Sequence, residues 1–148
     1  MAGTKQIHGA RVVVLRLDGV DPSVAAEGLR SLGMIHAVGL ADQGELSLHV
    51  EQGRVDVIVV AAARAAPDPV APAGALPRPP DAALRSGIPC LLLVPAFSRA
   101  VARAALTLGY AAAMSADAAP RLVYRRVGAL MQRVRRSGRA RDVAGETG

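Results

Sequence analysis

Short apolar runs and turn residues alternate along this chain in a regular order. Runs rich in Val, Leu and Ile, which are typical of buried strands, occur at 11–17, 34–40, 55–60, 87–94 and 110–114. Stretches with helix-start signals or apolar residues at helical spacing follow them, at 21–32, 42–52, 81–86, 98–108 and 120–136. The pattern therefore predicts a strand followed by a helix, repeated along the whole chain.

This alternation predicts an α/β domain with a parallel sheet, helices on both faces and right-handed crossovers. The run Val55–Val60 is β-branched and does not alternate with polar residues, so we expect both of its faces to be covered. In such sheets, binding sites form beyond the carboxyl ends of the strands. The residues that follow the strands are therefore the first candidates for a site.

Capping residues support several of the predicted helix boundaries. Asp21 is expected to cap the first helix with Pro22 at its first position, Ser98 to cap the fourth, and Pro120 to open the last. Gly109 is expected to end the fourth helix.

The chain is predicted to form one domain with a tail at each end. Residues 1–10 form the N-terminal tail and 11–136 the domain. After Arg136 the sequence changes to Gly, Arg and small polar residues, so we expect 137–148 to be a flexible, frayed tail.

Residues 61–80, after the third strand, are rich in proline and alanine. Proline removes amide donors and favours extended conformations in the residue before it. We expect a long, mobile, solvated loop, with a proline-dependent recognition motif as the less favoured alternative.

Composition narrows the class of protein. The chain has 148 residues, of which 51% are hydrophobic and 2% aromatic, so aliphatic side chains must form the core. The lone cysteine, Cys90, allows no intrachain disulfide. No run approaches the roughly 18 apolar residues that span a bilayer, and the N-terminus lacks a secretory-type apolar core. A cytoplasmic protein without membrane contact is predicted.

The candidate catalytic and metal-binding residues are few. His8, His36 and His49 lack ligand spacing, and Cys90 lies in an apolar strand, where a thiol behaves as a small hydrophobe. No glycine-rich nucleotide motif and no nucleophile–base pair is evident. We therefore expect no metal, no cofactor and no enzymatic activity.

The last helix and the tail are strongly basic. The net charge is +6, and the arginines here are Arg121, Arg125, Arg126, Arg133, Arg135, Arg136, Arg139 and Arg141. A solvated helix face is the favoured interpretation, and electrostatic contact with nucleic acid or an acidic partner is the alternative. No helix-turn-helix pattern is present, so sequence-specific DNA binding by this chain alone is not expected.

Several stretches together resemble one known family. Arg103–Gly109, Tyr110–Ala119 and Pro120 match, without a gap, a helix ending in A-L-x-x-G, a strand of the type G-Y-L-L-K-D-A, and the proline that opens the last helix. Val55–Val60 and Ala26–Leu29 match the family's third strand and first helix. The chain thus resembles the receiver domain of response regulators, especially the NarL/LuxR type.

The resemblance spans residues 11–136 and implies a flavodoxin-like (βα)5 doubly wound parallel sheet of the CheY type. It also implies five positions for phosphoryl transfer: an acidic pair, an aspartate nucleophile, a hydroxyl, a lysine and an aromatic. The residues that fall on these positions are Asp18, Ala61, Pro95, Ala116 and Ala113, respectively, so only one carboxylate is left. The resemblance therefore indicates a degenerate pseudo-receiver that holds Mg²⁺ poorly and takes no phosphoryl group.

In the resembled family, partners and second copies bind a face made by the fourth helix, fifth strand and last helix. The matching residues are Arg99, Arg103, Tyr110, Arg121, Tyr124 and Arg125. The predicted function is a regulatory interaction or dimerisation module in signal transduction or transcriptional control. DNA would be reached only through a missing or partner DNA-binding domain. The alternative is a small-ligand sensor that uses the emptied pocket.

Overall fold

The strands form one five-stranded parallel sheet in the order β2-β1-β3-β4-β5. The computed structural model describes residues 11–16, 23–61, 76–95 and 97–147. Within them the strands are β1 (Val12–Arg16), β2 (Val38–Leu40), β3 (Val57–Ala61), β4 (Cys90–Val94) and β5 (Ala112–Ser115). The strand order reverses between β1 and β3, and this reversal is where doubly wound sheets place their sites.

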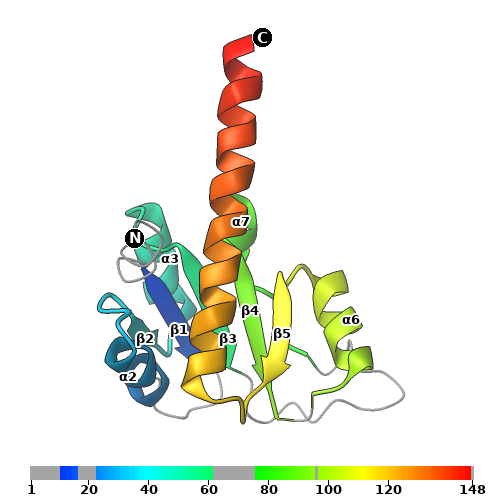
Figure 1. Ribbon diagram of the computed structural model, residues 1–148. Coiled ribbons are helices and arrows are strands. Elements are labelled where there is room, and N and C mark those ends of the chain that lie inside the picture. Colours follow the sequence, from blue (N-terminus) through cyan, green and yellow to red (C-terminus); the bar gives the residue numbers. More distant parts are fainter. Residues whose placement is uncertain (1–10, 17–22, 62–75, 96, 148) are drawn as a thin grey trace.

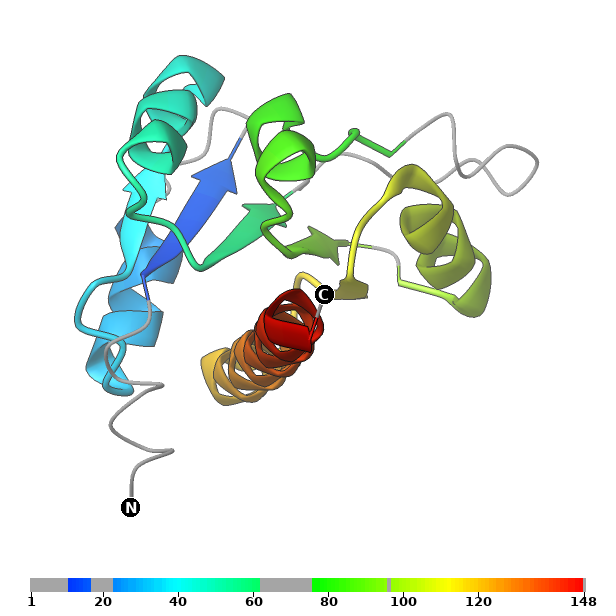
Figure 2. The ribbon, with the colours of Figure 1, turned by 90° about the horizontal axis from the view of Figure 1, so that it is seen from above.

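The helices cover both faces of the sheet, as the alternation predicted (Figure 1). They are α2 (Ser23–Ser31), α3 (Gln43–Glu51), α5 (Asp81–Ser86), α6 (Arg99–Leu108) and α7 (Pro120–Thr147). Helices α2 and α7 lie on one face, and α3, α5 and α6 lie on the other (Figure 2). The predicted flavodoxin-like α/β architecture is confirmed.

Alternate side chains of the central strands supply two separate aliphatic cores. Val60 and Leu92 point to the side of α3, α5 and α6, whereas Val59 and Leu91 point to the side of α2 and α7. Every residue of β3 and β4 is buried, and no buried residue among those described is polar or charged. The expectation that the third strand is covered on both faces is confirmed.

Several predicted helix boundaries are confirmed. The backbone N–H of Val101 donates to Ser98 Oγ at 3.2 Å, and Gly109 ends α6 with a φ of 110°. Pro120 begins α7, and the short helix expected at 81–86 is present as α5. The expected caps Asp21 and Pro22 lie outside the described residues.

The second strand is shorter than predicted. Residues 34–37 form turns instead, in which Ile35 N–H donates to Gly33 O and Ala37 N–H donates to Met34 O. Met34 is fully buried, so its apolar character reflects packing beneath α2 rather than strand pairing. Leu32, expected on the apolar side of the first helix, is 36% exposed because α2 ends at Ser31.

The last helix is longer than predicted. It continues to Thr147, rather than ending near Arg136, and rises well beyond the sheet (Figure 1). Arginine, alanine and glutamate are strong helix formers, and between residues 137 and 147 they outweigh the two glycines. The flexibility of 137–148 stays a prediction.

The end of the proline-rich segment is packed rather than solvated. Residues 62–75 lie outside the described part, but Leu76, Pro79 and Pro80 are buried. The hydroxyl of Tyr110 donates to Pro77 O at 2.8 Å and thereby ties this segment to the start of β5. The prediction of a loop that is solvated throughout is therefore wrong for 76–80.

We expect Tyr110→Phe to lower the free energy of unfolding by about 1–2 kcal/mol, because the Pro77 carbonyl loses its donor in a part-buried place. Urea unfolding followed by circular dichroism measures this. Tyr124→Phe is the matched control, since no hydrogen bond joins the Tyr124 hydroxyl to the described residues, and it should change stability by less than about 0.5 kcal/mol. Equal losses in the two variants would contradict the role of this hydrogen bond.

Candidate functional site

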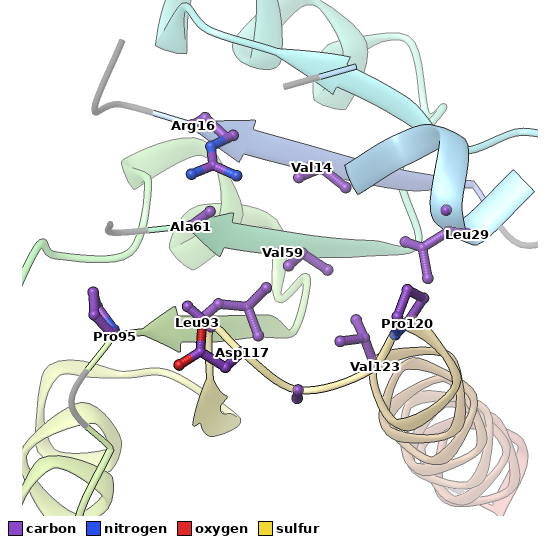
Figure 3. A pocket seen from close by; sticks show the side chains of 13 residues that line it. Val14, Arg16, Leu29, Val59, Ala61, Leu93, Pro95, Asp117, Pro120 and Val123 are labelled. Carbon is purple, nitrogen blue, oxygen red and sulfur yellow. The ribbon is translucent and has the colours of Figure 1, made fainter. Parts of the chain in front are cut away.

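The carboxyl ends of the central strands meet around one apolar cavity of about 460 Å³ (Figure 3). In the sheet register, Arg16 on β1 is opposite Ala61 on β3, which is opposite Leu93 on β4. The floor of the cavity comes from α2 and the first turn of α7. The lining residues are Val14, Arg16, Gly28, Leu29, Val59, Ala61, Leu93, Pro95, Ala116, Asp117, Ala118, Pro120 and Val123.

The structure brings together three of the five positions that the resemblance assigned to phosphoryl transfer. Ala61, Pro95 and Ala116 all line this cavity. Asp18 lies outside the described residues. Ala113 is half-buried and packs against the core on the opposite face of the sheet, beside α6, so it does not reach the cavity.

The chemistry available in the cavity is limited. Its charged side chains are Arg16, at the end of β1, and the exposed Asp117, after β5. The lining contains no hydroxyl, thiol, imidazole or amine among the residues described, so no nucleophile stands beside a base. Ala61 is 5% exposed, and its methyl group cannot form a bond to phosphorus. The cavity is suited to an apolar body with one polar end.

Sequence reasoning missed Arg16 and Asp117. Arg16 was counted within an apolar strand run, and Asp117 fell within the stretch Tyr110–Ala119 without a role of its own. Arg16 could have been found from the sequence, because it is a charged residue near the end of an apolar run. The carboxyl end of a strand is where a parallel sheet places its sites. Within the described residues, no group of three acidic, histidine or cysteine side chains could hold a metal ion.

The predicted partner arginines are exposed, but they belong to two separate surfaces. Arg99 and Arg103 are four residues apart on α6, and Arg121 and Arg125 are four residues apart on α7, so each pair shares one helix face. The buried residues of α6 and α7 belong to different cores, on opposite faces of the sheet. A partner that contacts both pairs must therefore reach around the edge strand β5 (Figure 2).

The two predicted partner tyrosines are not equivalent. Tyr124 is half-buried against the core between the sheet and α7, so part of its ring is accessible. Tyr110 is only 2% exposed, and burial, with a smaller contribution from nearby Cys90, raises its pKa. The assignment of Tyr110 to the partner surface is therefore corrected, because the ring fills the core instead.

Among the described residues, Cys90, His36 and His49 form no reactive centre with one another, and His8 lies outside the described part. Burial raises the pKa of the Cys90 thiol to about 12, so the thiol stays protonated at neutral pH. Its sulfur lies 3.8 Å from the carbonyl oxygen of Ile88. His36 and His49 line a different cavity, at the other end of the sheet.

Solved structures with the same architecture include receiver domains. The receiver domain of Francisella response regulator 1452 is 16% identical, with a TM-score of 0.57 over 84% of this chain and 98% of that chain. The receiver domain of a Mycobacterium tuberculosis protein assigned as the response regulator NarL is 17% identical, with a TM-score of 0.54 over 83% and 97%, respectively. A Burkholderia pseudomallei protein assigned to pilus assembly is 16% identical, with a TM-score of 0.59 over 83% and 92%.

The fold is therefore that of response-regulator receiver domains, as the sequence resemblance implied. At these identities the likeness establishes the fold and leaves the function open. No protein-family model and no curated protein matches the sequence. None of the helices in the described ranges has the length and apolar character needed to cross a membrane.

Proposed function

We propose that this protein is a phosphorylation-independent pseudo-receiver, that is, a regulatory module that acts by binding a protein partner. The receiver fold supports a role in signal transduction, and the NarL-type resemblance favours transcriptional control. Any contact with DNA would then come from a DNA-binding domain elsewhere, in a partner or in a longer chain.

One observation carries this proposal: the cavity at the strand ends is lined by Ala61, Pro95 and Ala116. These are the positions where the resemblance requires the nucleophile, the phosphate-binding hydroxyl and the phosphate-binding lysine. All three residues lack the group that the resemblance requires at their position. The loss of these groups supports a site that does not use phosphorylation as its switch.

The partner surface in this proposal consists of α6, β5 and α7. Strand β5 is an edge strand, and the helices beside it expose Arg99 and Arg103 on one side and Arg121 and Arg125 on the other. Two copies of such a surface would repel each other, whereas an acidic protein surface would be attracted. The charge therefore favours an acidic protein partner over a homodimer.

We expect no phosphoryl group on the protein after incubation with acetyl phosphate and Mg²⁺, because no aspartate stands at position 61 to accept it. Intact-mass spectrometry before and after mild acid treatment measures this. A receiver domain that keeps its aspartate, treated in parallel, is the positive control. An acid-labile mass gain of one phosphoryl group on this chain would refute phosphorylation independence.

We expect partner capture from a lysate of the cells that produce this protein to depend on both arginine pairs. The double variants Arg99→Glu/Arg103→Glu and Arg121→Glu/Arg125→Glu should each retain less than about a tenth of the captured protein, because attraction to an acidic surface is replaced by repulsion. Quantitative mass spectrometry of the eluates measures this. Arg85→Glu on α5 is the matched control at another exposed arginine. Full retention by both double variants would rule out this surface.

A second candidate function, small-ligand sensing, is favoured by the cavity itself. Its volume of about 460 Å³ falls within the range of ligand pockets, about 300–1,000 Å³. Its walls are mostly aliphatic, with the Arg16 guanidinium at one end (Figure 3). Guanidinium has five N–H donors, so Arg16 can donate hydrogen bonds to a ligand carboxylate in addition to its other interactions. An apolar carboxylate is the ligand class that fits.

We expect octanoate, as a probe of this class, to raise the melting temperature saturably if the cavity is a sensor. Ala61→Leu fills the cavity and should abolish the rise, whereas Ala129→Leu adds the same atoms at an exposed site on α7 and should preserve it. Differential scanning fluorimetry measures both. An unchanged melting temperature in the wild-type protein would reject the sensor and leave the binding module.

A further inference from the structure

A second cavity lies at the amino ends of the strands, away from the site described above. Its volume is about 440 Å³. It is bounded by the residue before β1, the end of α2, the turns that lead into β2, and the end of α3 with the residues that follow it. The lining residues are Arg11, Val13, Arg30, Ile35, His36, Ala37, Val38, His49 and Arg54.

The charge of this cavity is of one sign. Three guanidinium groups and two imidazoles line it, and none of the described lining residues carries a carboxylate. Arg11 donates to Gly53 O at 3.1 Å and Arg30 donates to Ala37 O at 3.4 Å, so within the described residues both side chains bond to neutral carbonyls. For Arg54, no hydrogen bond or ion pair joins its side chain to the residues that the structure describes.

One acidic side chain is hydrogen-bonded to a residue of the lining. The carboxylate of Asp56 accepts the backbone N–H of Arg11 at 2.9 Å and is not part of the lining. Like charges held around one concavity repel each other, and this cost is relieved when an anion enters. Guanidinium groups bind phosphate oxygens through paired N–H donors, which makes phosphate the best-matched anion.

Two of the aliphatic side chains that line the same cavity are exposed to solvent. Ile35 is 65% exposed and Val38 is 40% exposed, although both are large apolar residues. An inorganic anion would leave them in water, whereas an organic ligand with a flat or apolar part would cover them. The lining thus matches a molecule that carries both phosphate and an apolar or aromatic portion.

We propose that this cavity binds a small organic phosphate, with its phosphate groups on Arg11, Arg30 and Arg54 and its apolar part against Ile35 and Val38. The cavity volume suits a molecule of nucleotide size. This site is independent of the proposed partner surface and of the cavity at the carboxyl ends. The alternative is that the chain, with its net charge of +6, attracts any polyanion without a defined site.

The test is isothermal titration calorimetry with ADP and with pyrophosphate as probes. ADP should bind saturably at one site per chain and more tightly than pyrophosphate. Arg54→Gln should weaken ADP binding about tenfold, because it removes one charged contact, and it breaks no hydrogen bond with the described residues. The matched control Arg85→Gln, an exposed arginine on α5, should change the affinity less than about twofold.

A second variant separates the two halves of the proposed contact. Ile35→Ser should weaken ADP binding and leave pyrophosphate binding unchanged, because only the organic part covers Ile35. Three results would overturn the proposal: no saturable ADP binding, equal losses in Arg54→Gln and Arg85→Gln, or binding of a DNA duplex without binding of ADP. Equal losses in the two variants would indicate that the basic residues attract any polyanion. DNA binding without ADP binding would indicate a nucleic-acid surface.

Discussion

The rest of the structure depends on the burial of three central strands on both of their faces. Apart from Arg16 and Cys90, strands β1, β3 and β4 are built of aliphatic residues, and no buried residue of the described core is classed as polar or charged. Such strands are stable only when helices cover both of their faces. Helices α2 and α7 therefore pack on one face, and α3, α5 and α6 pack on the other. The near absence of aromatics makes this packing depend on Val, Leu, Ile and Ala.

Because the faces of the sheet are fully used for packing, polar chemistry is confined to the two ends of the strands. At the carboxyl ends, small side chains leave an apolar cavity with Arg16 and Asp117 as its charged residues. At the amino ends, arginines and histidines surround a cavity without acidic lining. The described linings of the two cavities therefore differ in chemistry, and the proposals made above assign them ligands of different classes.

The proposed partner surface is shaped by the same packing. Tyr110, two residues before β5, is buried in the core and donates a hydrogen bond to the Pro77 carbonyl, so its ring is not available on the surface beside α6. What the described parts of α6 and α7 present instead is mainly arginine with scattered aliphatic side chains, such as Leu106 and Leu122. Under the proposed function, a partner would recognise the positive charge of α6 and α7 and the arrangement of these two helices on opposite sides of β5.

The sequence by itself determined the elements whose signals are local: the alternation of strands and helices, the Ser98 cap, the turn at Gly109 and the start of α7 at Pro120. It also indicated, through the family resemblance, that Ala61, Pro95 and Ala116 would meet. Only the tertiary structure decided that Met34 packs as a turn residue, that Tyr110 is buried, and which arginines share a cavity. These outcomes depend on contacts between residues far apart in the chain, and periodicity along the chain carries no information about such contacts.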